Sequence, residues 1–400
     1  METHWPTPEK LAYQLATQHL ARAASVSAEV PRLLVASQSS AQAARALAAG
    51  ATLQIDLFEP EHYRFARLFS TAPSSSGQLP SSGQLPQSIA ASVEKLHLCE
   101  TAIEQFPSGS TIHWLCQSDP PAEVLYDLAI LSLRRDGTSE WAREMIQEFA
   151  ARLHPEGTFI VVTDHGDDAW VGDQLRLLAK SVRRERLVDT ERVFAATAYL
   201  VGRDKMRLRT RSYACQFAFR DRGQLIQVSS RPGVFSHRKL DLGARRLIDA
   251  MALEPESRVL DLGCGSGVVG LAAALRDPSI FVTAIDSHAR AVECTAKSAA
   301  LNQVIDRYSV LLSSACESGA PGTFDVVFAN PPYFAQMQIA ELFLEGAVRA
   351  LRPGGQLFAV CKQPQWYQVH APRWFDRVGL TETHGGYWIV AGRAPEKSLI

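Results

Sequence analysis

The chain has 400 residues, of which 46% are hydrophobic, and a formal net charge of −1. One usual domain has about 100 to 200 residues, so this length predicts two domains, and the near-zero charge excludes a protein that is basic throughout. No run of about 18 uncharged apolar residues occurs, and Met1-Glu-Thr-His-Trp-Pro lacks a signal-peptide pattern, so we expect a cytoplasmic protein.

The first half contains two aliphatic runs that predict strands, Leu33 to Ala36 and Thr52 to Phe58. Asp56 and Glu59 lie at the second run, but acids at strand ends are ordinary. The turn after the first run, at 37–39, has neither a glycine nor an acid. This half therefore has the alternating strands and helices of an α/β domain but no recognisable ligand-binding loop.

A tandem repeat interrupts the first half: Ser75-Ser-Gly-Gln-Leu-Pro80 is followed at once by Ser81-Ser-Gly-Gln-Leu-Pro86. Serine, glycine and proline without apolar periodicity cannot bury enough surface to order a chain. We expect a mobile insertion at about 72–90.

Two segments of the first half match the second half in one register. Residues 126–135 align with 324–333 and residues 153–162 with 351–360, each at an offset of 198. This common offset predicts an internal duplication. In the first copy Ser132, Leu133 and Arg134 stand where the second has Asn330, Pro331 and Pro332. The alternative is an unrelated α/β domain with a similar rhythm.

Positive charge is concentrated between the two halves. From Lys180 to Arg246 the chain has seventeen Lys and Arg against six Asp and Glu. Within the expected junction, 201–229, alternate basic residues would share one face of an extended segment and could contact RNA phosphates: Lys205, Arg207, Arg209 and Arg211. The alternative is a solvated linker face that keeps the chain soluble.

The second half opens with a glycine loop, Val259-Leu-Asp261-Leu-Gly263-Cys-Gly265-Ser-Gly267, between a predicted strand and the apolar helix Val268 to Leu275. Glycines allow the positive φ and the close backbone approach that such a turn needs. The loop amides and the helix N-terminus can face a polar ligand. The Asp261 carboxylate can take an ammonium group of that ligand.

The next predicted strand, Ile280 to Ile285, ends in Asp286. A carboxylate at this place can accept hydrogen bonds from both hydroxyls of a ribose. A dinucleotide is one possible ligand. The spacing Gly-x-Gly-x-Gly after an acid favours S-adenosylmethionine over the dinucleotide fingerprint.

A third predicted strand, Phe324 to Ala329, runs into Asn330-Pro331-Pro332-Tyr333. Asn330 would lie beyond the carboxyl end of the strand, where open parallel sheets bind ligands, and the two prolines would hold a rigid corner. The Asn330 side-chain oxygen and the Pro331 carbonyl can accept the hydrogens of a planar amine, and Tyr333 can stack on its ring. The motif predicts methyl transfer to an amide or amine nitrogen.

The segment Ser230-Arg-Pro-Gly-Val-Phe-Ser236, then Leu240-Asp-Leu-Gly243, precedes the glycine loop. With the loop, Asp286 and Asn-Pro-Pro-Tyr, it resembles the bacterial ribosomal RNA guanine-N2 methyltransferases over about 225 to 393. The resemblance implies two tandem Rossmann-like class I methyltransferase domains, a degenerate one at 1–200 and a catalytic one at 230–400. It implies S-adenosylmethionine as donor, held by Asp261, Gly263, Gly265, Gly267, Asp286 and Asn330, and a guanine of ribosomal RNA as acceptor, held by Asn330 to Tyr333.

Two other classes stay open. One is an Asn-Pro-Pro-Tyr enzyme that methylates a protein glutamine or a DNA adenine, and the other is a non-catalytic RNA-binding assembly factor that retains only the fold. The seven cysteines contain no Cys-x-x-Cys pair and the eleven histidines show no metal-ligand spacing, so no metal is expected. We expect a monomer that binds ribosomal RNA or a ribosomal subunit and no membrane.

Overall fold

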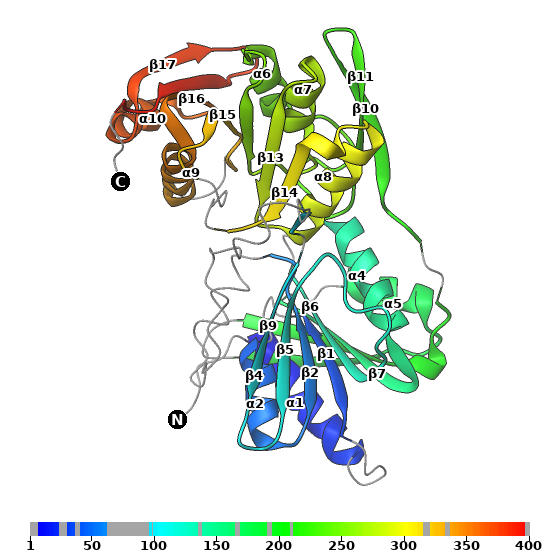
Figure 1. The fold of residues 1–400 in the computed structure, drawn as a ribbon. Helices are drawn as coiled ribbons and strands as arrows, with labels where there is room; N and C mark the ends of the chain where they lie inside the picture. The colour runs from blue at the N-terminus through cyan, green and yellow to red at the C-terminus, as the bar shows by residue number, and fades with distance from the viewer. Residues whose placement is uncertain are drawn as a thin grey trace. The chain divides into compact units, whose positions relative to one another are not determined.

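A computed structural model gives the fold and describes residues 7–23, 30–36, 41–61, 96–97, 99–134, 138–164, 169–189, 194–208, 211–314, 321–332 and 337–396. The chain divides into two compact units (Figure 1), one of Met1–Ser81 with Cys99–Tyr213 and one of Ser82–Leu98 with Ala214–Ile400. Each unit contains an eight-stranded sheet with helices. The expected tandem α/β fold is therefore confirmed.

The sheet of the first unit has the strand order β4-β5-β2-β1-β6-β7-β9-β8. Its central strands are parallel and buried, as in sheets that helices cover on both faces. The strands are β1 (Arg32–Ala36), β2 (Gln54–Phe58), β4 (Glu100–Gln105), β5 (Thr111–Cys116), β6 (Tyr126–Leu133), β7 (Leu153–Thr163), β8 (Arg183–Asp189) and β9 (Phe194–Gly202). The helices are α1 (Thr7–Ala23), α2 (Ala41–Gly50), α4 (Ser139–Ala151), α5 (Trp170–Leu178) and the 3-10 turn η2 (Arg203–Lys205).

The main sheet of the second unit has the order β17-β18-β16-β15-β12-β13-β14-β3. Its strands are β3 (Leu96–His97), β12 (Arg258–Leu262), β13 (Phe281–Asp286), β14 (Tyr308–Leu312), β15 (Phe324–Ala329), β16 (Leu351–Cys361), β17 (Asp376–Glu382) and β18 (Trp388–Arg393). Its helices are α6 (Leu242–Ala250), α7 (Val268–Arg276), α8 (Ala289–Leu301), α9 (Met337–Ala350) and α10 (Pro364–His370), with the 3-10 turns η3 (Ile305–Arg307) and η4 (Ala371–Arg373).

A separate hairpin, β10 (Cys215–Asp221) and β11 (Gln224–Ser230), precedes this sheet in the second unit. Two of its backbone N–H groups donate to side chains of α8 and its C-cap: Gln227 N–H to Asn302 Oδ1 at 3.0 Å and Ser229 N–H to Ser298 Oγ at 2.9 Å. The basic junction expected at 201–229 thus holds the end of β9, η2 and most of this hairpin.

The two sheets share one connectivity. The strands β5-β2-β1-β6-β7-β9-β8 correspond in order and direction to β14-β13-β12-β15-β16-β18-β17. The pairing of β6 with β7 shifts register between Tyr126 and Leu128, and that of β15 with β16 shifts between Phe324 and Val326. These shifts are 198 residues apart, the offset that predicted a duplication.

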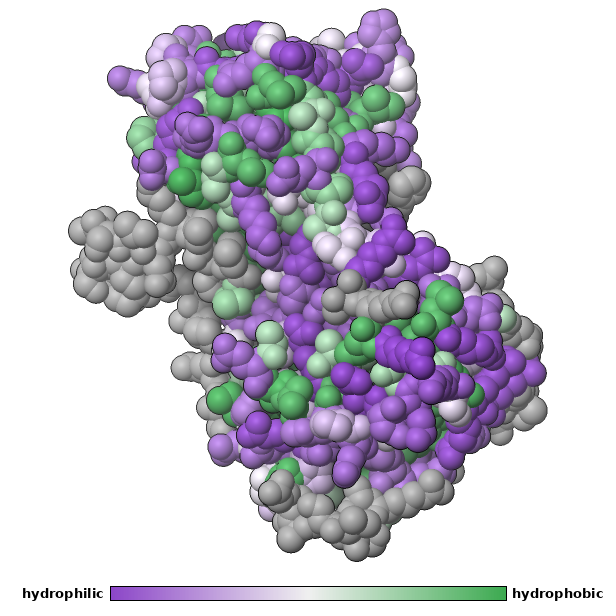
Figure 2. Space-filling view, turned by 90° about the vertical axis from the view of Figure 1, so that its right-hand side faces the viewer, coloured by the Kyte–Doolittle hydropathy of each residue, from purple (hydrophilic) through white to green (hydrophobic). Residues whose placement is uncertain are grey.

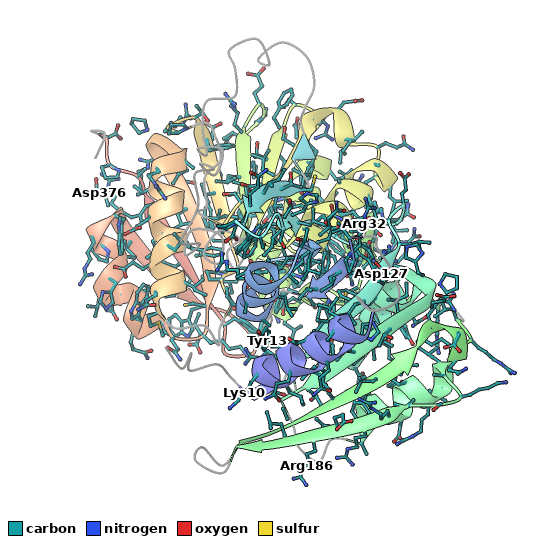
Figure 3. The ribbon with its side chains drawn as sticks, turned by 90° about the horizontal axis from the view of Figure 1, so that it is seen from below. Lys10, Tyr13, Arg32, Asp127, Arg186 and Asp376 are labelled. Carbon is teal, nitrogen blue, oxygen red and sulfur yellow. The ribbon has the colours of Figure 1, made fainter. Side chains whose placement is uncertain are left out.

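A side-chain contact also recurs at the start of the central strand. Asp127 Oδ2 accepts from Arg32 N–H at 2.9 Å in the first unit, where the two residues lie side by side in Figure 3. Asp325 Oδ2 accepts from Arg258 N–H at 2.7 Å in the second. Each aspartate is the second residue of the strand next to the central one, so the same bond links the same two strands in both copies.

The copies differ where the second carries its prolines. Strand β15 ends at Ala329, directly before Asn330, because Pro331 and Pro332 have no N–H to donate to a strand ladder. Strand β6 continues through Ser132 and Leu133, which pair with β7 and are buried. At the carboxyl end of this strand the second unit therefore presents the polar side chain of Asn330, whereas in the first unit the strand itself continues through the same place.

The insertion expected at about 72–90 lies outside the described residues. Figure 2 shows hydrophilic residues over much of the visible face, with hydrophobic residues in patches between them. Within the described ranges no helix is long and apolar enough to cross a membrane.

Candidate cofactor and acceptor site

The glycine loop joins β12 to α7 and is held against β13. The backbone N–H groups of Gly263 and Cys264 both donate to the Ile285 carbonyl, at 2.8 and 2.9 Å. Gly263 and Gly267 have φ angles of +74° and +84°, which L-residues with a side chain rarely adopt. A side chain at Gly267 would also meet Thr295 at 2.9 Å. Both glycines are therefore required by the turn, as the sequence predicted.

Asp286 ends β13 and binds the loop directly. Its Oδ2 accepts from the Gly265 N–H at 2.8 Å, and its Oδ1 accepts from the His288 N–H at 2.9 Å. A carboxylate has about four lone-pair sites, so both oxygens retain capacity for ligand hydroxyls. The residue predicted to hold a ribose therefore also fixes the loop that would cradle the rest of the ligand.

Asp261 lies in β12 and is only 3% exposed. Its Oδ2 accepts from the Gly270 N–H at 2.9 Å. Burial raises the pKa of this carboxyl to about 7; the Gly270 N–H opposes that rise and the charge of Asp286 adds to it. An ammonium group placed beside Asp261 would favour its charged form.

Tyr308 lies behind the loop with its hydroxyl fully buried and, within the described part of the chain, without a hydrogen-bond partner. A methyl group added at Gly270 would lie 2.2 Å from this hydroxyl and 3.0 Å from Asp261 Oδ2. Burial raises the pKa of Tyr308, and the charge of Asp261 adds to the rise. Tyr308 and Asp261 thus meet at the bare backbone of Gly270, a packing arrangement that the motif alone did not indicate.

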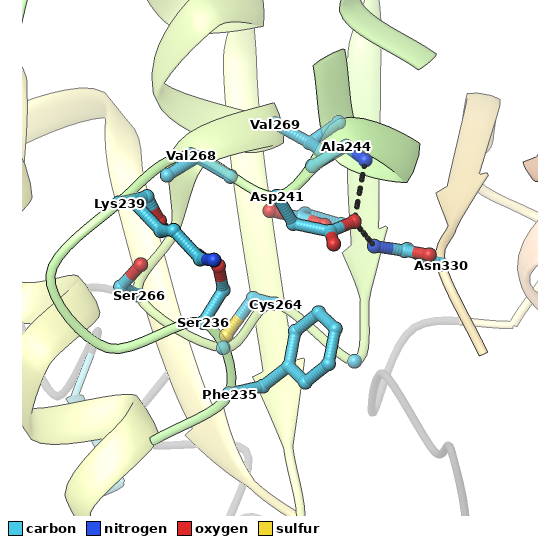
Figure 4. A pocket seen from close by; sticks show the side chains of 13 residues that line it. Phe235, Ser236, Lys239, Asp241, Ala244, Cys264, Ser266, Val268, Val269 and Asn330 are labelled. Atoms are coloured by element: carbon cyan, nitrogen blue, oxygen red, sulfur yellow. Dashed lines mark hydrogen bonds between the residues drawn. The ribbon is translucent and has the colours of Figure 1, made fainter. Parts of the chain in front are cut away.

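Asn330 follows β15 and faces a residue from another element. Its Nδ2 donates to Asp241 Oδ2 at 3.1 Å, and the same oxygen accepts from Ala244 N–H at 2.9 Å, where Asp241 caps the N-terminus of α6 (Figure 4). In the sequence, Asp241 belongs to the Leu-Asp-Leu-Gly pattern of the family segment. It was missed as a site residue, although an Asp before an amphipathic helix is an N-cap signal.

One pocket is lined by four of the six residues predicted to hold the cofactor. Asp261, Gly263, Gly265 and Asn330 line it, together with residues of the segment before α6 and of the start of α7 (Figure 4): Phe235, Ser236, Lys239, Asp241, Ala244, Cys264, Ser266, Val268 and Val269. Asp286 does not line the pocket but is hydrogen-bonded to the lining residue Gly265, and Gly267 is the N-cap of α7. Pro331 and Pro332 follow Asn330, whereas Tyr333 lies outside the described residues.

The structure describes only part of the segment in which the basic residues are expected to share one face. Lys205 ends the 3-10 turn η2 and pairs with Asp204, so the predicted alternation is wrong at its first member: the Met206 N–H closes this turn on the Arg203 carbonyl. Arg207 and Arg211 are exposed, and the Arg211 guanidinium lies 5.3 Å from the Tyr213 ring centre. Arg209 lies outside the described residues.

The first unit has one acid at the place equivalent to Asp286. Glu59 directly follows β2, as Asp286 ends β13, and it is fully buried. Its Oε1 accepts from the Glu61 N–H at 3.0 Å, the bond that Asp286 makes with the residue two positions on. Asp56 instead lies inside β2, where it accepts from the Tyr126 hydroxyl at 2.6 Å. The glycine-free turn at 37–39 lies outside the described residues.

No group of three or more His, Cys, Asp or Glu side chains that could hold a metal ion occurs in the part of the chain that the structure describes.

The sequence matches the family model of the methyltransferase small domain over residues 225–391. Ribosomal RNA small subunit methyltransferase C of Pseudomonas entomophila (strain L48) is 30% identical over 250 residues, which cover 62% of this chain and 73% of that protein. The protein of the same name from Shigella flexneri serotype 5b is 38% identical over 136 residues, covering 33% of this chain and 39% of that protein.

Among solved structures, a T. thermophilus 16S rRNA N2 G1207 methyltransferase in complex with AdoMet and guanosine superposes with a TM-score of 0.67. The alignment covers 98% of this chain and 92% of that chain, at 18% sequence identity. At this identity the likeness establishes the fold, and it extends over both units.

Proposed function

The chain belongs to the family of the ribosomal RNA small subunit methyltransferase C proteins, and from that premise we propose that it transfers a methyl group from S-adenosylmethionine to the exocyclic N2 amine of a guanine in ribosomal RNA. The pocket of the second unit is the proposed site. The observation that carries the proposal is that the glycine loop, the Asp261 carboxylate and the Asn330 amide line one pocket, with Asp286 hydrogen-bonded to the loop at Gly265.

The residues of the pocket fit S-adenosylmethionine. Gly263 and Gly265 line the pocket without side chains next to the N-terminus of α7, Asp261 can accept the ammonium group, and Asp286 can accept the ribose hydroxyls. The cofactor, when bound, supplies an electrophilic methyl group on a positively charged sulfur. Gly267 completes the turn without lining the pocket.

Asn330, Pro331, Pro332 and Tyr333 are the proposed acceptor residues. The guanine N2 lone pair is delocalised into the ring, so the enzyme must hold the amine in line with the methyl group. Acceptance of the two N2 hydrogens by Asn330 Oδ1 and the Pro331 carbonyl would do this, and such positioning can supply much of the lowering of the barrier. No strong base is needed, because the N2 proton can leave to solvent after transfer.

The first unit and the basic residues are proposed to hold the RNA. Lys205, Arg207, Arg209 and Arg211 would contact phosphates, whose neutralisation supplies sequence-independent affinity. A ribosomal RNA substrate also implies action in the cytoplasm, and we propose that the protein works as a monomer. The division of labour between a degenerate domain at 1–200 and a catalytic one at 230–400 belongs to the same proposal.

The test is to compare modified nucleosides in ribosomal RNA from cells with and without this gene. We expect one N2-methylguanosine to disappear without the gene and to return with the wild-type protein. If the ribosomal RNA keeps all its N2-methylguanosines and instead a protein glutamine or a DNA adenine loses its methyl group, the proposed acceptor is wrong.

A further inference from the structure

The amide of Asn330 can face the pocket in two ways that differ only by a flip about its last side-chain bond. Its oxygen can accept hydrogen bonds and its nitrogen can only donate them. An amine that must be held by its own hydrogens needs the oxygen. A flipped amide would present two N–H groups to an N–H donor, so the flip would remove the proposed acceptor function without displacing the residue.

Asp241 distinguishes the two orientations. An ionised carboxylate accepts hydrogen bonds and cannot donate them, and Asp241 Oδ2 lies 3.1 Å from Asn330 Nδ2. In this arrangement the Asp241 carboxylate accepts a hydrogen bond from Asn330 Nδ2, and Asn330 Oδ1 points away from the carboxylate (Figure 4). Amide orientations are assigned from such networks, and here the partner admits one orientation only.

Asp241 is itself held in place. Its Oδ2 also accepts from Ala244 N–H at 2.9 Å, and its backbone is extended at φ −67° and ψ 142°, the conformation of an N-cap residue. The first turn of α6 therefore fixes the carboxylate, and the carboxylate fixes the amide. One oxygen serves both bonds, so any side chain with an oxygen at that point could serve both.

We propose that Asp241 is a positioning residue that orients the Asn330 amide so that its oxygen faces the acceptor amine. This inference rests on the proposed function, because it assigns the orientation of the residue that would hold the guanine N2. Asp241 itself touches neither the methyl group nor the base in this mechanism.

The test compares two substitutions that separate the shape of Asp241 from its charge. Asp241→Asn keeps an oxygen that can accept from both Ala244 and Asn330 but removes the charge. Asp241→Ser keeps a good helix cap, but its shorter side chain cannot also hold Asn330. Asp249→Ser, on the same helix with Asp249 41% exposed and paired with Arg245 at 2.7 Å, is the matched control for loss of an aspartate.

Turnover is measured by transfer of labelled methyl groups to small ribosomal subunits and to RNA extracted from them, both from cells lacking the gene. Cofactor affinity is measured separately by calorimetry. We expect Asp241→Ser to lower kcat about 10- to 100-fold, the scale for a misplaced reacting group, with the cofactor Kd changed less than about twofold. Asp241→Asn should restore most of kcat, and Asp249→Ser should resemble wild type.

Two results would overturn the proposal. If Asp241→Ser turns over at the wild-type rate, Asn330 does not need this partner. If both Asp241 variants lose cofactor affinity in parallel, the function of the Asp241 carboxylate is to bind the cofactor ammonium and not to orient the Asn330 amide. A wild-type protein that methylates no guanine N2 in either substrate would instead refute the proposed function, which is a separate outcome.

Discussion

Asp286 and Gly265 are joined by a hydrogen bond of 2.8 Å from the Gly265 N–H to the Asp286 Oδ2. The bond links the carboxyl end of β13 to the glycine loop after β12. One carboxylate thus shapes the loop and, in the proposed function, also holds the ribose. Its loss should therefore lower cofactor affinity in two ways, by removing the ribose contact and by releasing the loop.

We therefore predict that Asp286→Ala weakens S-adenosylmethionine binding by at least about tenfold, because hydrogen bonds to a charged group contribute about 1.5 to 3 kcal/mol. Calorimetric titration measures the change. Glu59→Ala at the equivalent place of the first unit, and Asp56→Ala inside β2, should leave the affinity unaltered. A second cofactor bound per chain, lost in Glu59→Ala, would show that the first unit also binds.

A second prediction concerns pH. The pKa of Asp261 is raised to about 7 by burial, and the cofactor ammonium would bind its ionised form. Ionisation increases as pH rises, so affinity should rise toward pH 7, by up to about tenfold per pH unit well below the pKa. Asp261→Asn should bind the cofactor more weakly, and its affinity should not rise in this way between acidic pH and pH 7. Equal pH profiles of wild type and variant, measured by calorimetry, would remove Asp261 from the ammonium site.

The third prediction separates the acceptor from the donor. Asn330→Ala should reduce methyl transfer to ribosomal RNA by at least about 100-fold, since the acceptor amine loses its positioning. Its cofactor Kd should stay within about twofold of wild type, because the other pocket residues remain. Single-turnover measurement with saturating cofactor is the suitable assay. Transfer near the wild-type rate would contradict the mechanism.

The cofactor loop and the tandem fold were predictable from the sequence because both rest on local patterns. Gly263 and Gly267 have positive φ angles, and glycine is the residue that adopts such angles readily, so the residue type alone indicates the turn. The duplication was visible because two segments, 126–135 and 153–162, recur at one offset of 198, and the structure shows that Asp127 and Asp325 within it make the same bond.

Contacts between distant segments were not predictable in this way. The bond from Asn330 to Asp241 spans 89 residues, and the meeting of Tyr308 with Gly270 depends on how β14 packs behind the loop. The extended backbone expected at Lys205 was wrong for a related reason. Alternation predicts a strand only if the backbone is extended, and the turn η2 forms there instead.

The fourth prediction uses the contact of Tyr308 with Gly270. Tyr308→Phe should raise the free energy of unfolding by about 1 kcal/mol, because a buried hydroxyl without a partner costs about 1 to 3 kcal/mol. Gly270→Ala should destabilise, since the added methyl would lie 2.2 Å from that hydroxyl. The double variant should recover part of the loss in urea unfolding. Additive effects would mean that the two positions do not meet.

The last prediction concerns the basic residues after β9, which the proposed function assigns to RNA phosphates. Replacing Lys205, Arg207, Arg209 and Arg211 with Gln should weaken RNA binding and flatten the slope of log affinity against log salt by about two to four units, at about 0.7 to 0.9 per phosphate contact. Cofactor binding should not change. The charge-matched control replaces exposed arginines of the second unit, Arg352, Arg373, Arg377 and Arg393, and should leave the slope as it is. If the first set also leaves affinity and slope unchanged, these residues form a solvated surface, and the RNA path is to be sought near Arg231, Arg238 and Lys239, in the segment that runs to the pocket.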